Sequence, residues 1–188
     1  MEKWKKIWEK KGLLETNNLK LLDGFENTNI HEHSIAQSIT KKINICAEDK
    51  VLEIGCGAGM IAQFLVCKYF GIDYSHSLVK KHKQILGNNV LVSEANKIPY
   101  PDKYFEKCFA FSVFHYFPDK DYSNQVINEM ERVTKESIFI GDLPKCSHDS
   151  DHLLYNKTDF NKWEISPGFY NFNRFNLCKT INNDSNSA

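Results

Sequence analysis

Val51-Leu-Glu-Ile-Gly-Cys-Gly-Ala-Gly59 is the stretch of this 188-residue chain that decides its fold. A short, mostly apolar run that ends in glycines is typical of a buried parallel strand followed by a tight loop. Glycine lets the backbone turn sharply, and it lets a ligand approach where a Cβ atom would collide. Ligands of open α/β sheets bind beyond the carboxyl ends of the strands. We therefore expect a strand at residues 51–54 and a ligand-binding loop directly after it.

Downstream of this loop, apolar runs alternate with helical patterns. We expect strands at residues 69–72, 90–92, 108–112 and 137–141, and helices at residues 60–66, 78–86 and 122–134. Gly87 is a plausible cap for the helix that ends before it. Strands that alternate with helices imply right-handed crossovers between parallel strands. The fold class is therefore α/β, with a single doubly wound, mostly parallel sheet of the Rossmann-like kind.

The ends of the chain follow other patterns. Apolar residues recur at helical spacing in residues 4–11 and 31–43, which predicts two N-terminal helices. A short helix is expected near residues 159–163, and an edge strand at residues 174–178. We expect one domain over residues 1–181, with an N-terminal helical cap (1–48), a cofactor-binding core (49–142) and a shortened acceptor-side part (143–181). Residues 182–188 are small and polar, so we expect a disordered tail.

The amino-acid composition indicates which kinds of partner the chain is expected to bind. Lys plus Arg and Asp plus Glu both number 24, so the formal net charge is zero. Nucleic-acid binding usually requires a basic excess, so this balance argues against nucleic acid as the main partner. The N-terminus lacks a secretory signal, and no apolar run reaches the length of a membrane span. The six cysteines form no C-x-x-C pair. We expect a cytoplasmic monomer or homodimer with reduced thiols.

The glycine loop departs from the dinucleotide pattern. That pattern reads G-x-G-x-x-G, whereas this loop reads G-x-G-x-G with Met60 in place of the last small residue. Glu53 precedes the first glycine by two residues, and a carboxylate there suits a cationic ligand better than a pyrophosphate. The stretch resembles motif I of the class I methyltransferases, whose cofactor S-adenosylmethionine carries a sulfonium and an ammonium group. The resemblance implies cofactor contacts from Glu53, Gly55, Cys56, Gly57 and Gly59.

A second block supports the same family. Gly71-Ile-Asp-Tyr-Ser75 ends the second expected strand, and it resembles the segment in which an acidic residue binds both ribose hydroxyls. A carboxylate accepts two hydrogen bonds at once, and a vicinal diol can donate both. The resemblance therefore implies that Asp73 holds the ribose and that Tyr74 lies beside the cofactor.

Two further segments of the sequence resemble one branch of this family. Ser93-Glu-Ala-Asn-Lys-Ile-Pro-Tyr100 resembles the D-A-x-x-L-P-F segment of the ubiquinone/menaquinone-methyltransferase-like branch (type 11), which implies adenine contacts from Glu94 and Ala95. Residues 105–116 resemble F-D-x-h-h-h-S-x-h-h-H-H, which implies that Ser112 and His115 lie at the methyl end. The resemblance covers residues 49–142. The K-P-G-G turn of that branch is replaced by Lys135-Glu-Ser137, so we expect a differently built loop there.

Other side chains are candidates for the acceptor side. His115 follows the fourth expected strand, where a histidine can take a proton from the acceptor. The alternative is that its ring only packs against Tyr116. Asp and His side chains near residue 150 have the composition of metal ligands, but the metal-dependent families show other motifs, so we expect no metal. The acceptor-side candidates are Asp142, His148, His152, Tyr170 and Arg174.

The resemblance implies an S-adenosylmethionine-dependent methyltransferase. We expect a small-molecule acceptor with an oxygen or nitrogen nucleophile, such as a sugar or a secondary-metabolite precursor. One alternative is a non-catalytic cofactor-binding module that regulates a partner subunit. Another is an NAD-type Rossmann enzyme, against which Met60 and the lack of a Tyr-x-x-x-Lys motif argue. Trp4 and Trp8 either cover the cofactor or only anchor a helix.

Overall fold

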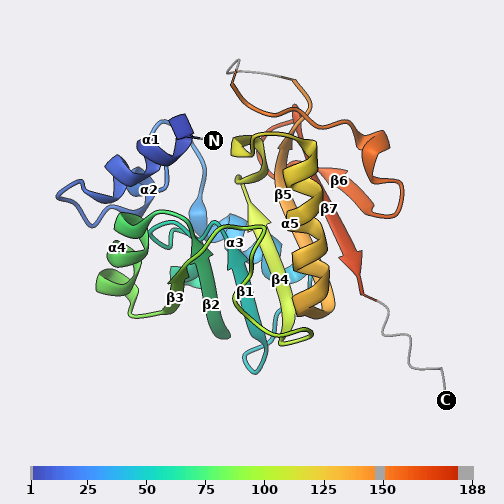
Figure 1. Cartoon of the computed structure of the whole chain (residues 1–188), viewed down its shortest axis with the longest axis horizontal. Helices are drawn as coiled ribbons and strands as arrows, with labels where there is room; N and C mark the ends of the chain where they lie inside the picture. The colour runs from blue at the N-terminus through green and yellow to red at the C-terminus, as the bar shows by residue number, and fades with distance from the viewer. Residues whose placement is uncertain (1, 147–150, 182–188) are drawn as a thin grey trace.

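The computed structural model describes residues 2–146 and 151–181. A seven-stranded sheet with the order β3-β2-β1-β4-β5-β7-β6 runs through it (Figure 1). The strands are β1 (Lys50–Ile54), β2 (Lys68–Asp73), β3 (Asn89–Val92), β4 (Phe105–Phe111), β5 (Thr134–Pro144), β6 (Glu164–Pro167) and β7 (Arg174–Thr180). The first five strands are parallel, and β7 is antiparallel to both β5 and β6. This is the doubly wound α/β sheet that the sequence predicts.

Five α-helices are present among the described residues. They are α1 (Glu2–Gly12), α2 (Leu19–Leu22), α3 (Glu32–Lys42), α4 (His76–Leu86) and α5 (Lys120–Val133), with 3-10 turns η1 (Ala62–Phe64), η2 (Phe114–Tyr116) and η3 (Lys157–Phe160). The Ser75 hydroxyl caps α4 by accepting the Leu78 N–H, and Gly87 ends the helix in the left-handed conformation at φ 69°. Ser75 is a typical N-cap residue, and Gly87 is the C-cap that the sequence predicts.

The predicted helix at residues 60–66 is wrong, because only the turn η1 forms there. The chain must return along β1, whose five residues span about 16 Å at 3.3 Å per residue. A helix over residues 60–66 would advance only about 10 Å. Residues 65–67 add about 10 Å when extended, so together with the three residues of η1, at about 2.0 Å per residue, they cover the distance. The Lys68 N–H then bonds to the Asp49 carbonyl at 2.9 Å.

The C-terminal part also differs from the prediction. The strand expected at the edge, residues 174–178, is β7, and it lies between β5 and β6. The edge strand is β6, whose four residues include a charge and end at Pro167. Proline is tolerated only at such edges because it lacks the N–H that a ladder needs. The short helix expected near residues 159–163 forms as the turn η3. At residues 133–134, α5 passes directly into β5, which confirms the altered loop.

Two apolar layers cover the sheet. On one face, the β1 residues Leu52 and Ile54 are buried with Val126 and Met130 of α5. On the other face, α3 and the N-terminal segment pack over Val51 and the neighbouring strands. This packing aligns the carboxyl ends of β1, β2, β4 and β5 at one edge of the sheet, where α1 and α2 also lie (Figure 1). Among the described residues, no helix is long and apolar enough to cross a membrane.

Candidate functional site

The glycine loop after β1 adopts backbone conformations that other residues avoid. Gly55 and Gly57 have φ angles of 70° and 49°. A Cβ atom on Gly57 would lie 2.3 Å from the Oδ1 atom of Asp23. The Ile72 carbonyl of β2 accepts the N–H groups of Gly55 (2.8 Å) and Cys56 (3.0 Å), which holds the loop against the end of β2. The loop is therefore a tight cradle in which a side chain at Gly57 has no room.

Asp73 ends β2 beside this loop. Its Oδ2 atom accepts the Gly57 N–H at 3.0 Å, and its Oδ1 atom accepts the Ser75 N–H at 2.8 Å. Burial raises the pKa of Asp73 to about 6, against the opposing effect of these two hydrogen bonds. Each carboxylate oxygen can accept a further hydrogen bond. The fixed, buried carboxylate thus suits the ribose diol that the sequence assigns to it.

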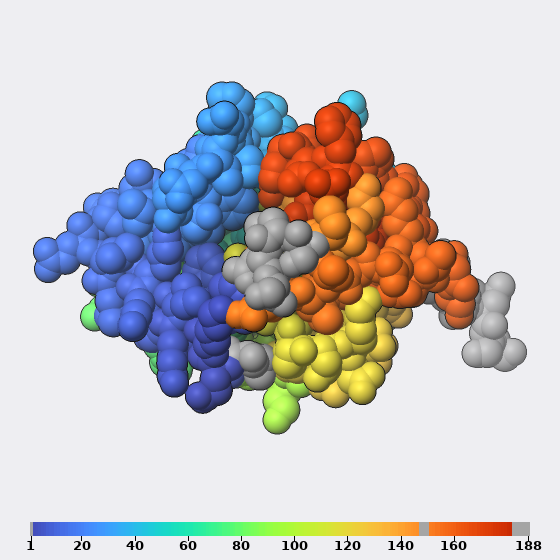
Figure 2. Space-filling view, turned by 90° about the horizontal axis from the view of Figure 1, so that it is seen from above, coloured from blue at the N-terminus to red at the C-terminus, as the bar shows by residue number. Residues whose placement is uncertain are grey.

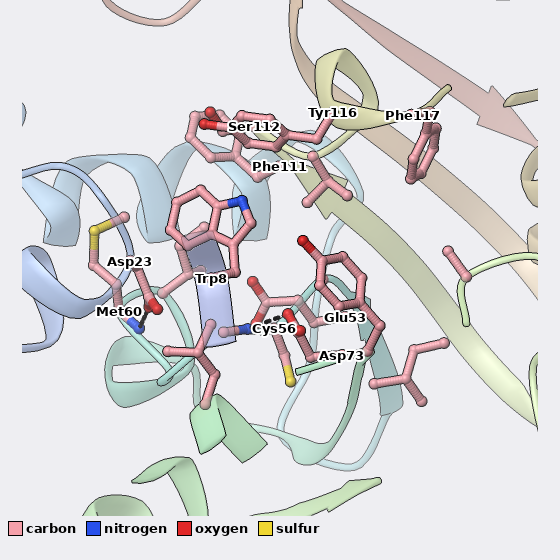
Figure 3. Close-up of a pocket in the computed structure, with 18 of the residues that line it drawn as sticks. Trp8, Asp23, Glu53, Cys56, Met60, Asp73, Phe111, Ser112, Tyr116 and Phe117 are labelled. Carbon is pink, nitrogen blue, oxygen red and sulfur yellow. Dashed lines mark hydrogen bonds between the residues drawn. The ribbon is translucent and has the colours of Figure 1, made fainter. Parts of the chain in front are cut away.

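Two more carboxylates lie at the same cavity. Glu53 accepts a hydrogen bond from the Tyr69 hydroxyl, and burial raises its pKa well above the usual value. Asp23 follows α2 and accepts the N–H groups of Ala58 (2.6 Å) and Met60 (2.8 Å), as Figure 3 shows for Met60. Burial raises the pKa of Asp23 to about 7. Sequence reasoning missed Asp23, because only the tertiary fold carries it across to the loop.

The cavity over the loop has a volume of about 90 Å³. The predicted residues that line it are Glu53, Gly55, Cys56, Gly57, Asp73, Tyr74, Ala95 and Ser112. None of the described residues that line it is Lys, Arg or His. Gly59 packs instead against Leu86 and His82, and Glu94 bonds to Lys5 and to the Tyr122 hydroxyl. Three carboxylates without a lining cation make the cavity suited to a positively charged ligand.

The helix α1 covers this cavity. Trp8 lies over the loop in Figure 3, and the rings of Trp4 and Trp8 pack on Tyr116 at 4.7 and 5.3 Å between centroids. The Glu9 carboxylate accepts hydrogen bonds from the Ser75 hydroxyl (2.7 Å) and the Ser77 N–H (3.1 Å). Trp8 therefore covers the cavity, whereas Trp4 anchors the helix outside it.

A second cavity of about 260 Å³ adjoins the first. Five residues line both cavities: Trp8, Asp23, Phe25, Ser112 and Tyr116. Of the predicted acceptor-side residues, Asp142, Tyr170 and Arg174 line the second cavity, together with His115. Seen from above, the N-terminal segment in blue and the C-terminal part in orange face each other across this region (Figure 2). We call this second cavity the acceptor cavity, because it shares a wall with the first cavity and is lined by three of the predicted acceptor-side residues.

Two residues with strained backbones line this cavity, Ser112 directly after β4 and Asp142 near the end of β5. Ser112 and Asp142 have φ angles of 58° and 67°, which are costly for residues other than glycine. The Ser112 hydroxyl donates to Asp142 Oδ2 at 2.8 Å. Arg174 donates from Nη1 to the Asp142 carbonyl at 3.1 Å, and its Nε lies 3.8 Å from Oδ1. A buried network fixes these polar groups in place.

His115 lies in η2 and is 2% exposed. Its ring packs against Tyr116 at 4.1 Å and against His152 at 4.6 Å between centroids, so the packing role is observed. Its role as a base stays a prediction. His148 lies outside the described residues. In residues 2–146 and 151–181, no group of three His, Cys, Asp or Glu side chains could hold a metal ion.

The fold is that of the class I, Rossmann-like methyltransferases, and the comparisons support S-adenosylmethionine as the cofactor. Residues 52–139 match the family described as Methyltransferase domain, Methyltransf_11. This is the type 11 family that the sequence motifs resemble, and the match covers the β1–β5 core.

Curated proteins with similar sequences match part of the chain. The chain is 30% identical over 91 residues to a tRNA (carboxymethyluridine(34)-5-O)-methyltransferase of Arabidopsis thaliana, which covers 48% of this chain and 22% of the relative. The chain spans only 22% to 39% of the lengths of the curated relatives it matches. The shared part is about half of this chain.

Solved structures share the fold. The magnesium protoporphyrin IX methyltransferase of Synechocystis, solved with bound SAH, has a TM-score of 0.66 and 13% identity, with 94% of each chain covered. The methyltransferase solved in complex with the Haloferax volcanii Trm112 activator has a TM-score of 0.67 and 14% identity, with 80% of this chain and 90% of that chain covered.

These comparisons correct the predicted partners. A small-molecule acceptor and no nucleic acid were predicted as the partners, and that prediction is wrong. One relative is named for a tRNA substrate, and one structural neighbour is bound to a protein activator. Zero net charge misled the prediction, because it describes the whole chain and not the surface around the site.

Proposed function

We propose that this chain is an S-adenosylmethionine-dependent methyltransferase that methylates a nucleoside of an RNA substrate. The observation that carries the proposal is the meeting of the two cavities at a shared wall. That wall includes Asp23, Ser112 and Tyr116. One cavity carries the carboxylates that suit the cofactor, and the other carries polar and aromatic groups that suit an acceptor.

When bound, S-adenosylmethionine supplies a methyl group activated by a sulfonium charge. Asp73 holds the ribose, and Glu53 and Asp23 balance the positive charge of the ligand. Trp8 and Tyr116 exclude water at the wall between the cavities. The rigid wall also orients the acceptor toward the cofactor. His115 lines the acceptor cavity and takes up the proton that a hydroxyl or amine acceptor loses.

RNA as the acceptor is supported by the tRNA methyltransferase relative. The zero net charge of this chain removes much of the long-range attraction that phosphates usually provide. We therefore expect the affinity for RNA to depend on contacts to the nucleoside in the acceptor cavity, and to be less sensitive to salt than in basic RNA-binding proteins.

The test is methyl transfer from S-adenosylmethionine labelled in its methyl group to unfractionated tRNA. We expect label in the RNA fraction, lost after ribonuclease treatment and lost in Asp73→Ala. Label that appears only in protein, or no transfer to RNA by a chain that binds the cofactor, would contradict the RNA substrate.

A further inference from the structure

The outer wall of the acceptor cavity is a hairpin tip. Residues 168–173 connect β6 to β7, and we call them the hairpin tip. Tyr170, Asn171 and Asn173 of this tip line the cavity, next to Arg174 at the start of β7. Three of the six residues in the tip are aromatic and two are asparagines. The cofactor cavity does not include any of them among its described lining residues, so the tip belongs to the acceptor side alone.

The hairpin tip is held in one conformation. The Gly168 N–H bonds to the Arg174 carbonyl at 3.1 Å, and the Arg174 N–H bonds to the Asn171 carbonyl at 3.0 Å. The Asn171 side chain accepts the Asn173 N–H at 2.8 Å. The Phe169 ring stacks on Phe139 at 5.5 Å with an angle of 5° between the planes. A ligand would therefore meet a preorganised surface, which reduces the entropy lost on binding.

Phe172 is the outermost part of this surface. It is 90% exposed, although it stands between two residues that line the cavity. Tyr170 is 41% exposed, and burial of its hydroxyl end beside Asp142 raises the pKa of the phenol, so the hydroxyl stays protonated and can donate. An exposed ring flanked by amides offers a face for stacking and edges for hydrogen bonds.

Such a surface matches a single-stranded nucleic acid. Unpaired bases stack on aromatic side chains and form hydrogen bonds along their edges with amides and hydroxyls. Lys145 is exposed, and its backbone N–H bonds to the Asn173 carbonyl at 2.9 Å, so the backbone of a positively charged residue adjoins the tip. Its side chain is long enough to reach the phosphates of a bound strand. The buried Ser112–Asp142–Arg174 network supplies fixed polar groups at the cavity floor.

We infer that the hairpin tip recognises two consecutive nucleotides of an unpaired RNA strand. The acceptor base enters the cavity beside Tyr170, Asn171 and Asn173, and the neighbouring base stacks on Phe172. This inference rests on the proposed function and adds the element that selects the substrate. The inference also gives a role to the exposed ring of Phe172, which the domain does not use for its own packing.

The test compares binding of a fluorescent single-stranded RNA of about ten nucleotides, a length that covers a typical single-strand site. Titrations are carried out with saturating SAH. Phe172→Ala should weaken RNA binding by roughly 5- to 150-fold, the range found for loss of one stacking contact. Phe172→Tyr keeps a ring and should bind within about twofold of the wild type. Affinity for SAH should be the same in all variants.

Val66→Ala is the matched control. Val66 is 78% exposed, but it lies just before β2 at the opposite edge of the sheet, so its variant should bind RNA normally. If the wild-type chain methylates RNA and the Phe172→Ala variant binds RNA as tightly as the wild type, the inference is overturned and the proposed function stands. Equal competition by duplex RNA would also overturn it. A wild-type chain that neither binds nor methylates RNA would overturn the proposed function as well.

Discussion

At the scale of single residues, the cofactor site is a group of like charges brought together by the fold. Asp23, Glu53 and Asp73 come from three different elements, and burial raises the pKa of each. In the absence of a ligand, ionisation of these three carboxyl groups lowers the stability of the folded protein, because their negative charges are buried close together. A ligand with a positive charge offsets that cost, so cofactor binding and ionisation of the three groups are linked.

This linkage predicts the pH dependence of cofactor binding. Asp73 titrates at about pH 6 and Asp23 at about pH 7 in the unliganded protein. Affinity for S-adenosylmethionine should therefore rise from pH 5 to pH 7.5 and then level off. Calorimetric titrations across this range measure it. Asp23→Asn should weaken binding and remove the upper part of the dependence, whereas the exposed control Asp102→Asn should change neither.

The stability of the unliganded protein should change in the opposite direction. A carboxyl group with a raised folded-state pKa contributes stability below its unfolded-state pKa and loses that contribution as pH rises through the folded-state value. The melting temperature without ligand should therefore fall between pH 5 and pH 8, and Asp23→Asn should flatten the fall. Differential scanning calorimetry tests this. A wild-type melting temperature that rises through this window would contradict the assigned environment of Asp23 and Asp73.

Gly57 is predicted to be required for binding of the cofactor, and not only for the stability of the fold. In Gly57→Ala, the new methyl group would lie 2.3 Å from Asp23 and displace that carboxylate. Gly87→Ala is a matched control, since Gly87 also has a positive φ (69°) but has no atom within 4 Å of the added group. Both variants should lose about 1–2 kcal/mol of stability from the left-handed backbone conformation. Only Gly57→Ala should lose cofactor affinity, and equal affinities would refute the cradle.

At the scale of elements, α1 decides whether the cofactor cavity is covered. Gly12 ends this helix against the backbone of α4, where an added Cβ would lie 2.5 Å from the Leu78 nitrogen. Backbone atoms cannot yield as a flexible side chain would. The contact between α1 and α4 therefore tolerates only glycine at this position, and it holds Trp8 over the glycine loop.

Gly12→Ala is predicted to loosen this cover. The variant should release S-adenosylmethionine faster in stopped-flow measurements, because Trp8 no longer closes the cavity. Emission from tryptophan should shift to longer wavelength, since two of the three tryptophans are on α1. Lys10→Ala, at an exposed position of the same helix, serves as the control. A release rate in Gly12→Ala equal to that of the control would show that α1 is only an anchor.

The elements also show where sequence patterns stop being informative. The strands could be predicted because most of β1 and β4 and the later part of β5 are buried on both faces, so their sequences contain short apolar runs there. The helix at residues 60–66 could not be excluded from its pattern, because the constraint is the distance back along β1. The strand β6 was missed because an edge strand of four residues carries little apolar pattern.

At the scale of the whole molecule, the site combines parts that the sequence keeps far apart. The motifs locate Glu53, the glycines, Asp73 and Ser112, since each lies at or just after the carboxyl end of a strand, and these ends meet at the same edge of the sheet. Asp23, Trp8 and the hairpin tip have no such anchor, and only the packed fold places them at the cavities. Nucleic acid was wrongly excluded as a partner, because net charge carries no information about which groups surround a pocket.

The most direct measurement is calorimetric titration of S-adenosylmethionine into the wild-type chain and Asp73→Ala, with Asp102→Asn as a control. We predict one site per chain in the wild type and the control. In Asp73→Ala, the loss of hydrogen bonds to a charged acceptor should weaken binding by about 1.5–3 kcal/mol. Absence of binding to the wild type, or unchanged affinity in Asp73→Ala, would contradict the assignment of this cleft as the cofactor site.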